Sequence, residues 1–505
     1  MRLPELLCPA GDLSRLKAAI HFGADAVYLA GETMGMRSAS RNFTIPQLAQ
    51  ATEYAHTRGK KVYLACNAML RNDQVDALPK LLPQWADCGV DALIAGDLGA
   101  LRIIKRLLPD MPVHISVQTG LANYEAVRAM ADFGACRAIL SRELVLDEIA
   151  TIRAKTPGCI ELEAFVHGSM CVSVSGRCLL SDYMTMQQSI PPHNDDNAGA
   201  KTVPGVDDKE KGSDDDASLV DGLFTGLSVD KSVCTDRQMV TDDENALNSG
   251  LPLADLNTHF IVHDKAACPP DDTAQAAIAS PLSCRSGNGG DCAQPCRWKY
   301  ALMEEKRPGE YYPVYETQEG SFLLNSKDLC MISHLSDMAE AGVTSLKIEG
   351  RAKSAYYAAV TANAYRCALD EWRERGYPHA FSPSHWMVEE LDKVSHRPYS
   401  TGFYLGGRGG QHTAGGGYVR DYEVMGVVID SVPGRVHVSQ RNKLYTGDRV
   451  ELLEPGRPPI ACTVSDLFDA EGNAIQSTPH PTMQYSFALE HAVQPGTLIR
   501  RARQI

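Results

Sequence analysis

The first half of the chain repeats a pattern in which a glycine that ends a helix is followed by an unbroken apolar run. Glycine suits the left-handed conformation that closes helices, and apolar runs without polar alternation are typical of parallel strands covered on both faces. The same pattern recurs after Gly342. Eight strands are expected, within residues 3–10, 22–30, 58–66, 88–96, 112–119, 133–141, 160–168 and 341–350.

Most of these strands are separated by about one helix's length of chain. Eight βα units favour a closed barrel over an open doubly wound sheet, although the periodicity alone does not exclude the open sheet. We therefore expect an α/β protein with a TIM-like (β/α)8 barrel.

The pattern changes twice along the rest of the chain. Within the insertion between the seventh and eighth strands, residues 194–221 are polar, acidic and poor in aromatics, so a mobile loop is expected. Beyond residue 373, short alternating strands with turn signals predict a small β-barrel domain. The expected parts are residues 1–186 and 284–373 for the barrel, 187–283 for a partly disordered acidic insertion, 374–415 for a linker with a helix, and 416–505 for the β-barrel domain.

Composition indicates a soluble protein of more than one domain, because 505 residues are too many for one ordinary core. The net charge of −14 is concentrated in residues 187–283, where 6 bases minus 18 acids give −12. The remainder is close to neutral, so an RNA substrate is compatible with the acidic total. No apolar run reaches the roughly 18 to 20 residues of a membrane helix, and the start lacks a signal-peptide pattern, so we expect no membrane partner and a cytoplasmic location.

Fifteen cysteines without a secretion signal indicate reduced thiols, some of them metal ligands. Four of them form two pairs on glycine-bearing segments, with gaps of six and three residues. Zinc ribbons prefer gaps of two, so the spacing favours a four-iron cluster, while zinc and unliganded thiols stay open. Cys284 and Cys330 are reserve ligands. The paired thiols are Cys171, Cys178, Cys292 and Cys296.

A second candidate site lies in SLKIEGRAKS, where Lys347, Glu349 and Arg351 follow each other at alternate positions at the end of the eighth strand. Active sites of βα barrels lie at this end, so the three residues are expected to bind an anionic substrate and manage protons. The alternative is a surface salt-bridge cluster. Further polar candidates at the same end of other strands are Asn67, Gln118, Arg142, Glu143, Glu163 and His167, the last of which could instead support the cysteine loop.

Several of these segments together resemble the collagenase-like family called peptidase U32, and the resemblance covers nearly the whole chain. They include PELLCPAGDLSRLKAAIHFGADAVYLAG, HISVQT with Asn123 following, FVHGSMCVSVSGRCLLS, CAQPCRWKY, NSKDLC and SLKIEGRAKSAYYAAV. We add Asn123 to the candidate substrate-binding residues on this ground. The much longer acidic insertion between the cysteine pairs departs from the family pattern.

Within that family, CRWKY, SHRPYSTGFY and the β-rich tail look most like the branch that hydroxylates a tRNA uridine at the wobble position. The resemblance implies an iron-sulfur cluster on the same four cysteines and prephenate as a co-substrate. It thus implies oxygen-independent formation of 5-hydroxyuridine in the anticodon region of tRNA, with an electron-donor protein as a further partner.

Two sets of basic residues receive roles on this hypothesis. Arg351, Lys347 and Arg142 would hold carboxylates, because arginine offers a bidentate fork and lysine a mobile charge. Basic residues of the tail would bind the RNA backbone through their charge. The alternative is that they lie on a solvated face of the sheet. The tail residues concerned are Arg420, Arg435, Arg441, Lys443 and Arg449.

Three other functions are compatible with the sequence. One is the peptidase activity of the family's historical label, but four thiolate ligands leave no metal position for water and no HExxH motif is present. A second is hydroxylation of ribosomal RNA or of a ubiquinone precursor. The third is a non-catalytic RNA-binding module with a structural cluster.

Overall fold

The computed structural model describes residues 3–35, 42–171, 173, 315–317, 320–322, 326–406 and 418–503. All of them belong to one compact unit formed by residues 1–226 and 284–505. The acidic insertion predicted for residues 187–283 lies outside the described residues. So do four of the cysteines singled out above, Cys178, Cys284, Cys292 and Cys296.

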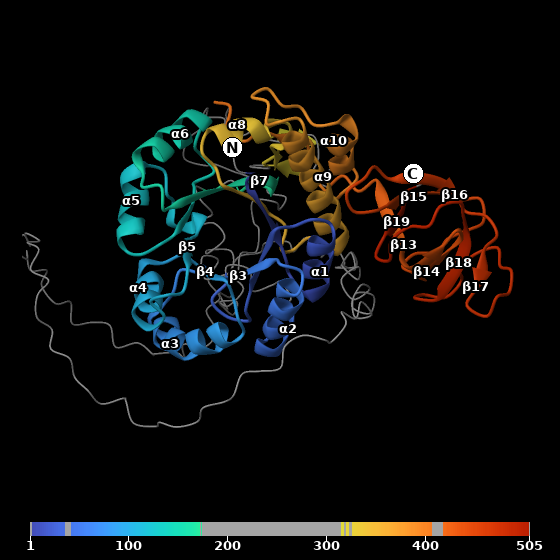
Figure 1. Cartoon of the computed structure of the whole chain (residues 1–505), viewed down its shortest axis with the longest axis horizontal. Coiled ribbons are helices and arrows are strands. Elements are labelled where there is room, and N and C mark those ends of the chain that lie inside the picture. Colours follow the sequence, from blue (N-terminus) through green and yellow to red (C-terminus); the bar gives the residue numbers. More distant parts are fainter. Residues whose placement is uncertain are drawn as a thin grey trace, which may run out of the picture. The chain divides into compact units, whose positions relative to one another are not determined.

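Eight parallel strands form a closed barrel, which confirms the predicted fold class (Figure 1). They follow one another in chain order, and β11 closes the ring by pairing with both β1 and β7. All eight strands lie where the apolar runs predict them. Their bounds are β1 (Glu5–Pro9), β2 (Ala26–Ala30), β3 (Lys61–Cys66), β4 (Ala92–Ala95), β5 (Val113–Ile115), β6 (Arg137–Ile139), β7 (Glu161–Ser169) and β11 (Ser345–Ile348).

Helices surround the strands, as the βα pattern requires (Figure 1). Side-chain caps begin several of them: Asp12 accepts a hydrogen bond from the Arg15 amide, and Asp97 accepts one from the Ala100 amide. The helices of the barrel are α1 (Leu13–His21), α2 (Ile45–His56), α3 (Asn72–Asp87), α4 (Leu98–Leu107), α5 (Tyr124–Asp132), α6 (Leu146–Lys155), α8 (Leu335–Glu340) and α9 (Ala355–Glu374), with short 3-10 turns η1 (Val117–Thr119) and η6 (Ile332–His334). The linker predicted for residues 374–415 contains α10 (His385–Asp392).

The seventh barrel strand extends beyond the barrel wall. The end of β7 pairs antiparallel with β10 (Asp328–Cys330), which in turn pairs with β12 (Tyr399–Ser400). A buried ion pair supports this extension, because Arg397 Nη2 lies 2.9 Å from Asp328 Oδ1. Two further short strands, β8 (Tyr315–Thr317) and β9 (Gly320–Phe322), pair with each other.

The tail forms a separate seven-stranded antiparallel sheet, a half-barrel with edge strands β16 and β17. It has its own core, yet Val427, Leu453 and Leu498 also belong to the apolar core of the βα barrel. The alternating pattern predicts four of the segments but not the last two strands. The strands are β13 (Tyr422–Val432), β14 (Gly434–Gln440), β15 (Arg449–Leu453), β16 (Ile460–Thr463), β17 (Phe468–Asp469), β18 (Gln484–Leu489) and β19 (Leu498–Ala502).

A search of the described helices finds none with the length and apolar character needed to cross a bilayer.

Candidate active site

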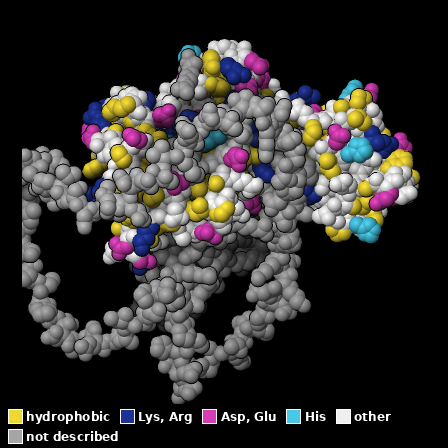
Figure 2. Space-filling view, turned by 60° about the horizontal axis from the view of Figure 1, so that its bottom comes forward, with side chains coloured by type: hydrophobic (Ala, Val, Ile, Leu, Met, Phe, Trp, Pro, Cys, Tyr) yellow, Lys and Arg dark blue, Asp and Glu magenta, His cyan; other side chains and the backbone are white. Residues whose placement is uncertain are grey.

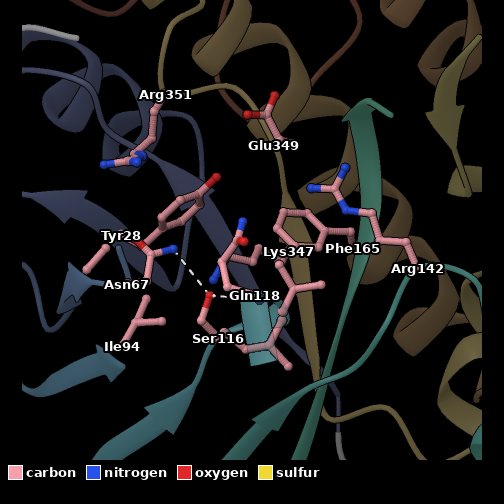
Figure 3. Close-up of a pocket in the computed structure, with 13 residues that line it drawn as sticks. Tyr28, Asn67, Ile94, Ser116, Gln118, Arg142, Phe165, Lys347, Glu349 and Arg351 are labelled. Carbon is pink, nitrogen blue, oxygen red and sulfur yellow. Dashed lines mark hydrogen bonds between the residues drawn. The ribbon is translucent and has the colours of Figure 1, made fainter. Parts of the chain in front are cut away.

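A polar pocket opens among the carboxyl halves of the barrel strands (Figure 3). Its empty space is about 540 Å³, including the part open to solvent. Tyr28 and Phe165 provide aromatic walls. Six of the candidates predicted from sequence line the same cavity: Asn67, Gln118, Arg142, Lys347, Glu349 and Arg351.

The charged triplet that ends β11 lies on one side of the chain, as its alternation predicts. Lys347, Glu349 and Arg351 all line the pocket, and each is less than a tenth exposed. The alternative of a surface salt-bridge cluster is therefore wrong for these three residues. In Figure 3, Arg351 and Glu349 lie above Asn67 and Gln118, and Lys347 lies beside Gln118, so cations and amides line one cavity.

The amide side of the pocket comes from β3 and β5. Asn67 Nδ2 donates to Ser116 Oγ at 3.2 Å, and the same oxygen accepts a hydrogen bond from the Gln118 backbone amide at 3.3 Å. These contacts hold the two loops that follow the strands against each other. The pocket therefore has a preorganised wall of amide and hydroxyl groups.

Arg142 joins the pocket to the end of β7. Its guanidinium lies 3.8 Å from the centre of the Phe165 ring, and its Nη1 donates to the Ser169 carbonyl at 2.9 Å. Cys171 follows two residues later and is exposed, with its Sγ 3.0 Å from Ser173 Oγ. A residue of the pocket thus also holds the backbone from which the cysteine loop begins.

Four other sequence candidates lie outside the pocket lining. Asn123 caps α5 by accepting a hydrogen bond from the Ala126 amide at 2.8 Å, and Glu143 accepts one from Ser141. His167 and Glu163 are buried in the wall and interior of the barrel, respectively. A structural role explains the contacts of Asn123, Glu143 and His167.

His167 packs among aromatic rings behind the pocket. Its ring centre lies 6.0, 5.5 and 5.2 Å from those of Tyr357, Tyr365 and Tyr399, respectively. Burial lowers the pKa of His167 to about 3, so the imidazole is neutral at physiological pH. This position suits the support of β7 and its cysteine loop.

The backbone between β7 and the β11 loop is tightly interlocked. The Glu349 amide donates to the His167 carbonyl at 2.8 Å, and Tyr357 OH donates to the Glu349 carbonyl at 2.9 Å. Gly168 has φ +104°, and a Cβ there would lie 2.4 Å from Glu349 O. No side chain fits at residue 168, because the loop after β11 lies directly against the end of β7. This contact fixes the spacing between Glu349 and the residues that lead to Cys171.

A buried charge cluster lies beneath the pocket. Lys347 Nζ donates to Glu163 Oε1 at 2.7 Å, while Arg137 Nη1 lies 3.0 Å from Glu163 Oε2 and 2.6 Å from Glu5 Oε1. Sequence reasoning did not select Arg137. The available signal was an arginine in the middle of the otherwise apolar strand ACRAIL, where a charge must be paired.

Two of the candidate cysteines, Cys171 and Cys330, lie within the described residues. Cys171 is an exposed thiol after β7, which suits a ligand. Cys330 Sγ lies 4.0 Å from Tyr365 OH, and burial raises the pKa of its thiol to about 11. Over the described ranges, no three His, Cys, Asp or Glu side chains are grouped to hold a metal ion.

The basic residues proposed for the tail differ in their surroundings. Arg435 donates to Asp466 O and Ser486 Oγ, and Arg441 donates to Ser439 Oγ. Lys443 lies over the Tyr445 ring, whereas Arg420 and Arg449 are exposed. In Figure 2, basic and acidic side chains are mixed on the visible face of the described surface.

The fold is that of a TIM-type barrel protein, and its pocket is lined by two arginines, a lysine and a glutamate. The chain belongs to peptidase family U32. The Peptidase family U32 profile matches residues 11–196 and 273–414, and that of the Peptidase family U32 C-terminal domain matches residues 420–500.

Three curated relatives are similar over most of this chain. "tRNA hydroxylation protein P1" of Bacillus subtilis (strain 168) is 28% identical over 99% of this chain and 95% of its own length. "tRNA hydroxylation protein P" of Escherichia coli (strain K12) is 32% identical, over 94% and 91%. "23S rRNA 5-hydroxycytidine C2501 synthase" of Escherichia coli (strain K12) is 26% identical, over 89% of this chain and 52% of that protein.

Proposed function

We propose that this protein hydroxylates a pyrimidine of RNA, specifically the wobble uridine of tRNA, forming 5-hydroxyuridine without molecular oxygen. Prephenate is the co-substrate, and a [4Fe-4S] cluster is the cofactor. The printed names of the relatives support the reaction class, because two refer to tRNA hydroxylation and the third to a 5-hydroxycytidine in ribosomal RNA.

The observation that carries the proposal is the convergence of Arg142, Lys347 and Arg351 on one cavity. Prephenate has two carboxylates, and guanidinium groups bind carboxylates through paired, charge-assisted hydrogen bonds. Arg351 and Arg142 lie on opposite sides of the cavity in Figure 3, with Lys347 between them. In the proposal, the two arginines orient the carboxylates and Lys347 supplies a third positive charge at the floor.

Glu349 is the carboxylate among these cations, and it is the residue we propose for moving a proton at the base or the co-substrate. Its backbone is held on both sides by His167 and Tyr357, and the residue lines the cavity. Arg142, Lys347 and Arg351 line the same cavity, so the Glu349 carboxylate lies among three cations. Asn67 and Gln118 would orient the bound molecules through their amide groups.

Cys171, Cys178, Cys292 and Cys296 would hold the iron-sulfur cluster. Cys171, the member of this set within the described residues, is an exposed thiol at the same rim as the pocket. When bound, such a cluster supplies one-electron redox chemistry that no amino-acid side chain of the pocket provides. Arg142 would connect the pocket with the cluster-binding segment, because it lines the pocket and donates to the Ser169 carbonyl, two residues before Cys171.

The peptidase alternative receives less support from the pocket. Its lining residues within the described chain include neither histidine nor cysteine. Ser116 accepts hydrogen bonds from Asn67 and from the Gln118 amide, and without a histidine in that lining it has no imidazole base. A hydrolytic nucleophile is therefore not assembled there.

The proposed function is tested by nucleoside analysis of total RNA from a deletion strain. We expect 5-hydroxyuridine and its derivatives to disappear from tRNA and to return with a plasmid-borne copy of the gene. Ribosomal RNA from the same cells is the control for substrate choice. Normal tRNA with a missing hydroxylated cytidine in ribosomal RNA would move the substrate to the ribosome, and no change in either RNA would refute hydroxylation.

The cluster is tested separately on anaerobically purified protein. Four thiolates predict about four irons and matching sulfide per chain. Cys171→Ala should lose this iron, whereas Cys159→Ala should keep it, because Cys159 is another exposed thiol that belongs to neither predicted pair. Stoichiometric zinc without sulfide would show that the metal assignment is wrong.

A further inference from the structure

The floor of the pocket rests on a carboxylate that does not itself line the cavity. Glu163, in the middle of β7, has no exposed surface. Its Oε1 accepts from Lys347 Nζ at 2.7 Å, and its Oε2 accepts from Arg137 Nη1 at 3.0 Å and Ser345 Oγ at 3.1 Å. Both oxygens are therefore engaged within the barrel, and only Lys347 of this group reaches the pocket.

Aromatic rings confine the Lys347 side chain on its other sides. Its Nζ lies 4.3 Å from the centre of the Tyr28 ring and 5.6 Å from that of Phe165. Ring faces attract a cation, and an ammonium has three donors, of which Glu163 takes one. The surroundings thus suit a charged lysine whose remaining donors are directed at the cavity.

We infer that Glu163 is a positioning residue, paired with Arg137, that keeps Lys347 charged and directed at the anionic ligand of the pocket. Glu163 touches neither substrate nor cofactor. The part of this inference that concerns the anionic ligand rests on the proposed function. The ion pair between Glu163 and Lys347 does not depend on it. Sequence reasoning placed Glu163 at the mouth of the barrel, and its burial between Lys347 and Arg137 corrects that placement.

The charges around Lys347 give the direction of the effect. Burial lowers the pKa of Lys347, and the Glu163 carboxylate opposes this. Burial alone would raise the pKa of Glu163, but Lys347 and Arg137 outweigh it and lower the pKa to about 2. The other charged neighbours that act on Lys347 are Arg137, from β6, and Arg351, after β11, and both disfavour the ammonium.

Two further groups face the same interior. His114, from β5, has a pKa lowered to about 3 by burial and by Arg137, so it is neutral above that pH. Glu5, from β1, pairs with Arg137 rather than with Lys347. Removing the charge of Glu163 therefore leaves the ammonium facing two cations, so the pKa of Lys347 falls further.

The first test is the pH dependence of unfolding by denaturant, which needs no ligand. In Glu163→Gln, the folded state releases the Lys347 proton at a pH where the unfolded chain still holds it. Stability then rises with pH, by up to tenfold in the folding constant per pH unit, between the lowered pKa of Lys347 in the folded variant and its ordinary value of 10.5. The matched control is Glu163→Gln with Lys347→Met, which lacks the titrating group and should show no such rise.

Parallel stability curves for these two variants would overturn the inference. A Glu163→Gln protein that fails to fold while the double variant folds would support it, because the unpaired ammonium is the relevant difference. Failure of both variants to fold, with Lys347→Met alone folded, would make Glu163 a structural residue and overturn it.

The second test is prephenate binding by calorimetry from pH 6 to 9.5. In Glu163→Gln, affinity should fall about tenfold per pH unit, beginning at a lower pH than in the wild type, because the ammonium is lost as the pH rises. Lys347→Met should bind weakly without this dependence. A Glu163→Gln variant with the wild-type pH profile would contradict the inference. If the wild type does not bind prephenate, the prephenate proposal is refuted. The unfolding test then decides whether Glu163 keeps Lys347 charged.

Discussion

Arg351 is 5% exposed and lines the pocket, so its guanidinium is the residue best placed to hold a carboxylate. Arg351→Lys keeps the charge but loses the planar fork. Losing a charge-assisted hydrogen bond costs about 1.5–3 kcal/mol, so we expect a roughly 10- to 100-fold loss of tRNA modification with unchanged iron content. The assay is 5-hydroxyuridine in tRNA from complemented deletion cells, beside iron per chain.

The matched control for this prediction is Arg375→Lys. Arg375 is about half exposed and pairs with Glu371 on the same helix. Surface pairs of this kind contribute about 0 to 1 kcal/mol, so modification should be normal. Normal modification in Arg351→Lys as well would remove Arg351 from the site, and joint loss of modification and iron would make it structural.

At this scale the sequence reveals polar residues that follow an apolar strand, because such positions lie at the barrel's rim. Asn67, Arg142 and Arg351 were found in this way, and all line the pocket. Charges inside strands were missed or misplaced, as with Arg137 and Glu163, because pairing partners more than a hundred residues apart are invisible to local pattern.

The contact between β7 and the loop after β11 is the element-scale feature on which the site depends. Gly168→Ala would put a Cβ 2.4 Å from Glu349 O, in backbone that cannot yield like a flexible side chain. We expect a loss of roughly 2–4 kcal/mol in unfolding free energy and loss of ligand binding in the pocket. Denaturant unfolding and prephenate calorimetry measure the two effects.

Gly120→Ala separates the steric effect from backbone strain. Gly120 also has positive φ, +71°, but a Cβ there meets nothing within 4 Å. Its replacement should cost only about 1–2 kcal/mol and leave binding unchanged. Equal effects of the two substitutions would show that the close approach to Glu349 is unimportant.

Strands were predictable from sequence where the segment itself shows an apolar run or an alternation of apolar and polar residues. The eight barrel strands follow continuous apolar runs, and β13 and β14 follow clear alternation. In contrast, β10 contains only three residues and exists because β7 is long enough to pair with it. The strand β19 has the sequence LIRRA. Its two arginines interrupt the apolar pattern expected of a buried strand, although Arg500 is fully buried.

At the scale of the whole molecule, Arg500 links the tail sheet to the barrel helices. Its Nη2 lies 2.6 Å from Glu451 Oε2, in β15, and 2.5 Å from Glu390 Oε1, in α10. Its Nη1 donates to Tyr356 OH, in α9, at 3.2 Å. Lys393 pairs with the same two carboxylates, each at 3.0 Å. The charges are thus arranged so that barrel and tail stabilise each other.

Arg500→Ala should lower the unfolding free energy by about 3–5 kcal/mol, because it leaves the buried Glu390 and the partly exposed Glu451 without their main partner. Arg449→Ala, an exposed arginine of the same sheet, should change it by less than about 0.5 kcal/mol. Burial alone would raise the pKa of Glu451, but Arg500 and Lys393 outweigh it and lower the pKa below its ordinary 4.5.

The stability from this pairing is therefore present above pH 4.5 and lost as the pH falls below it. Denaturant unfolding of wild type and Arg500→Ala at neutral and acidic pH should show a difference that shrinks on acidification, because Arg500 adds to the effect of Lys393 on Glu451 only while that carboxylate is ionised. A difference that stays constant with pH would mean that Arg500 acts by packing alone. A difference as small as that of Arg449→Ala would mean that the tail is stable without this link.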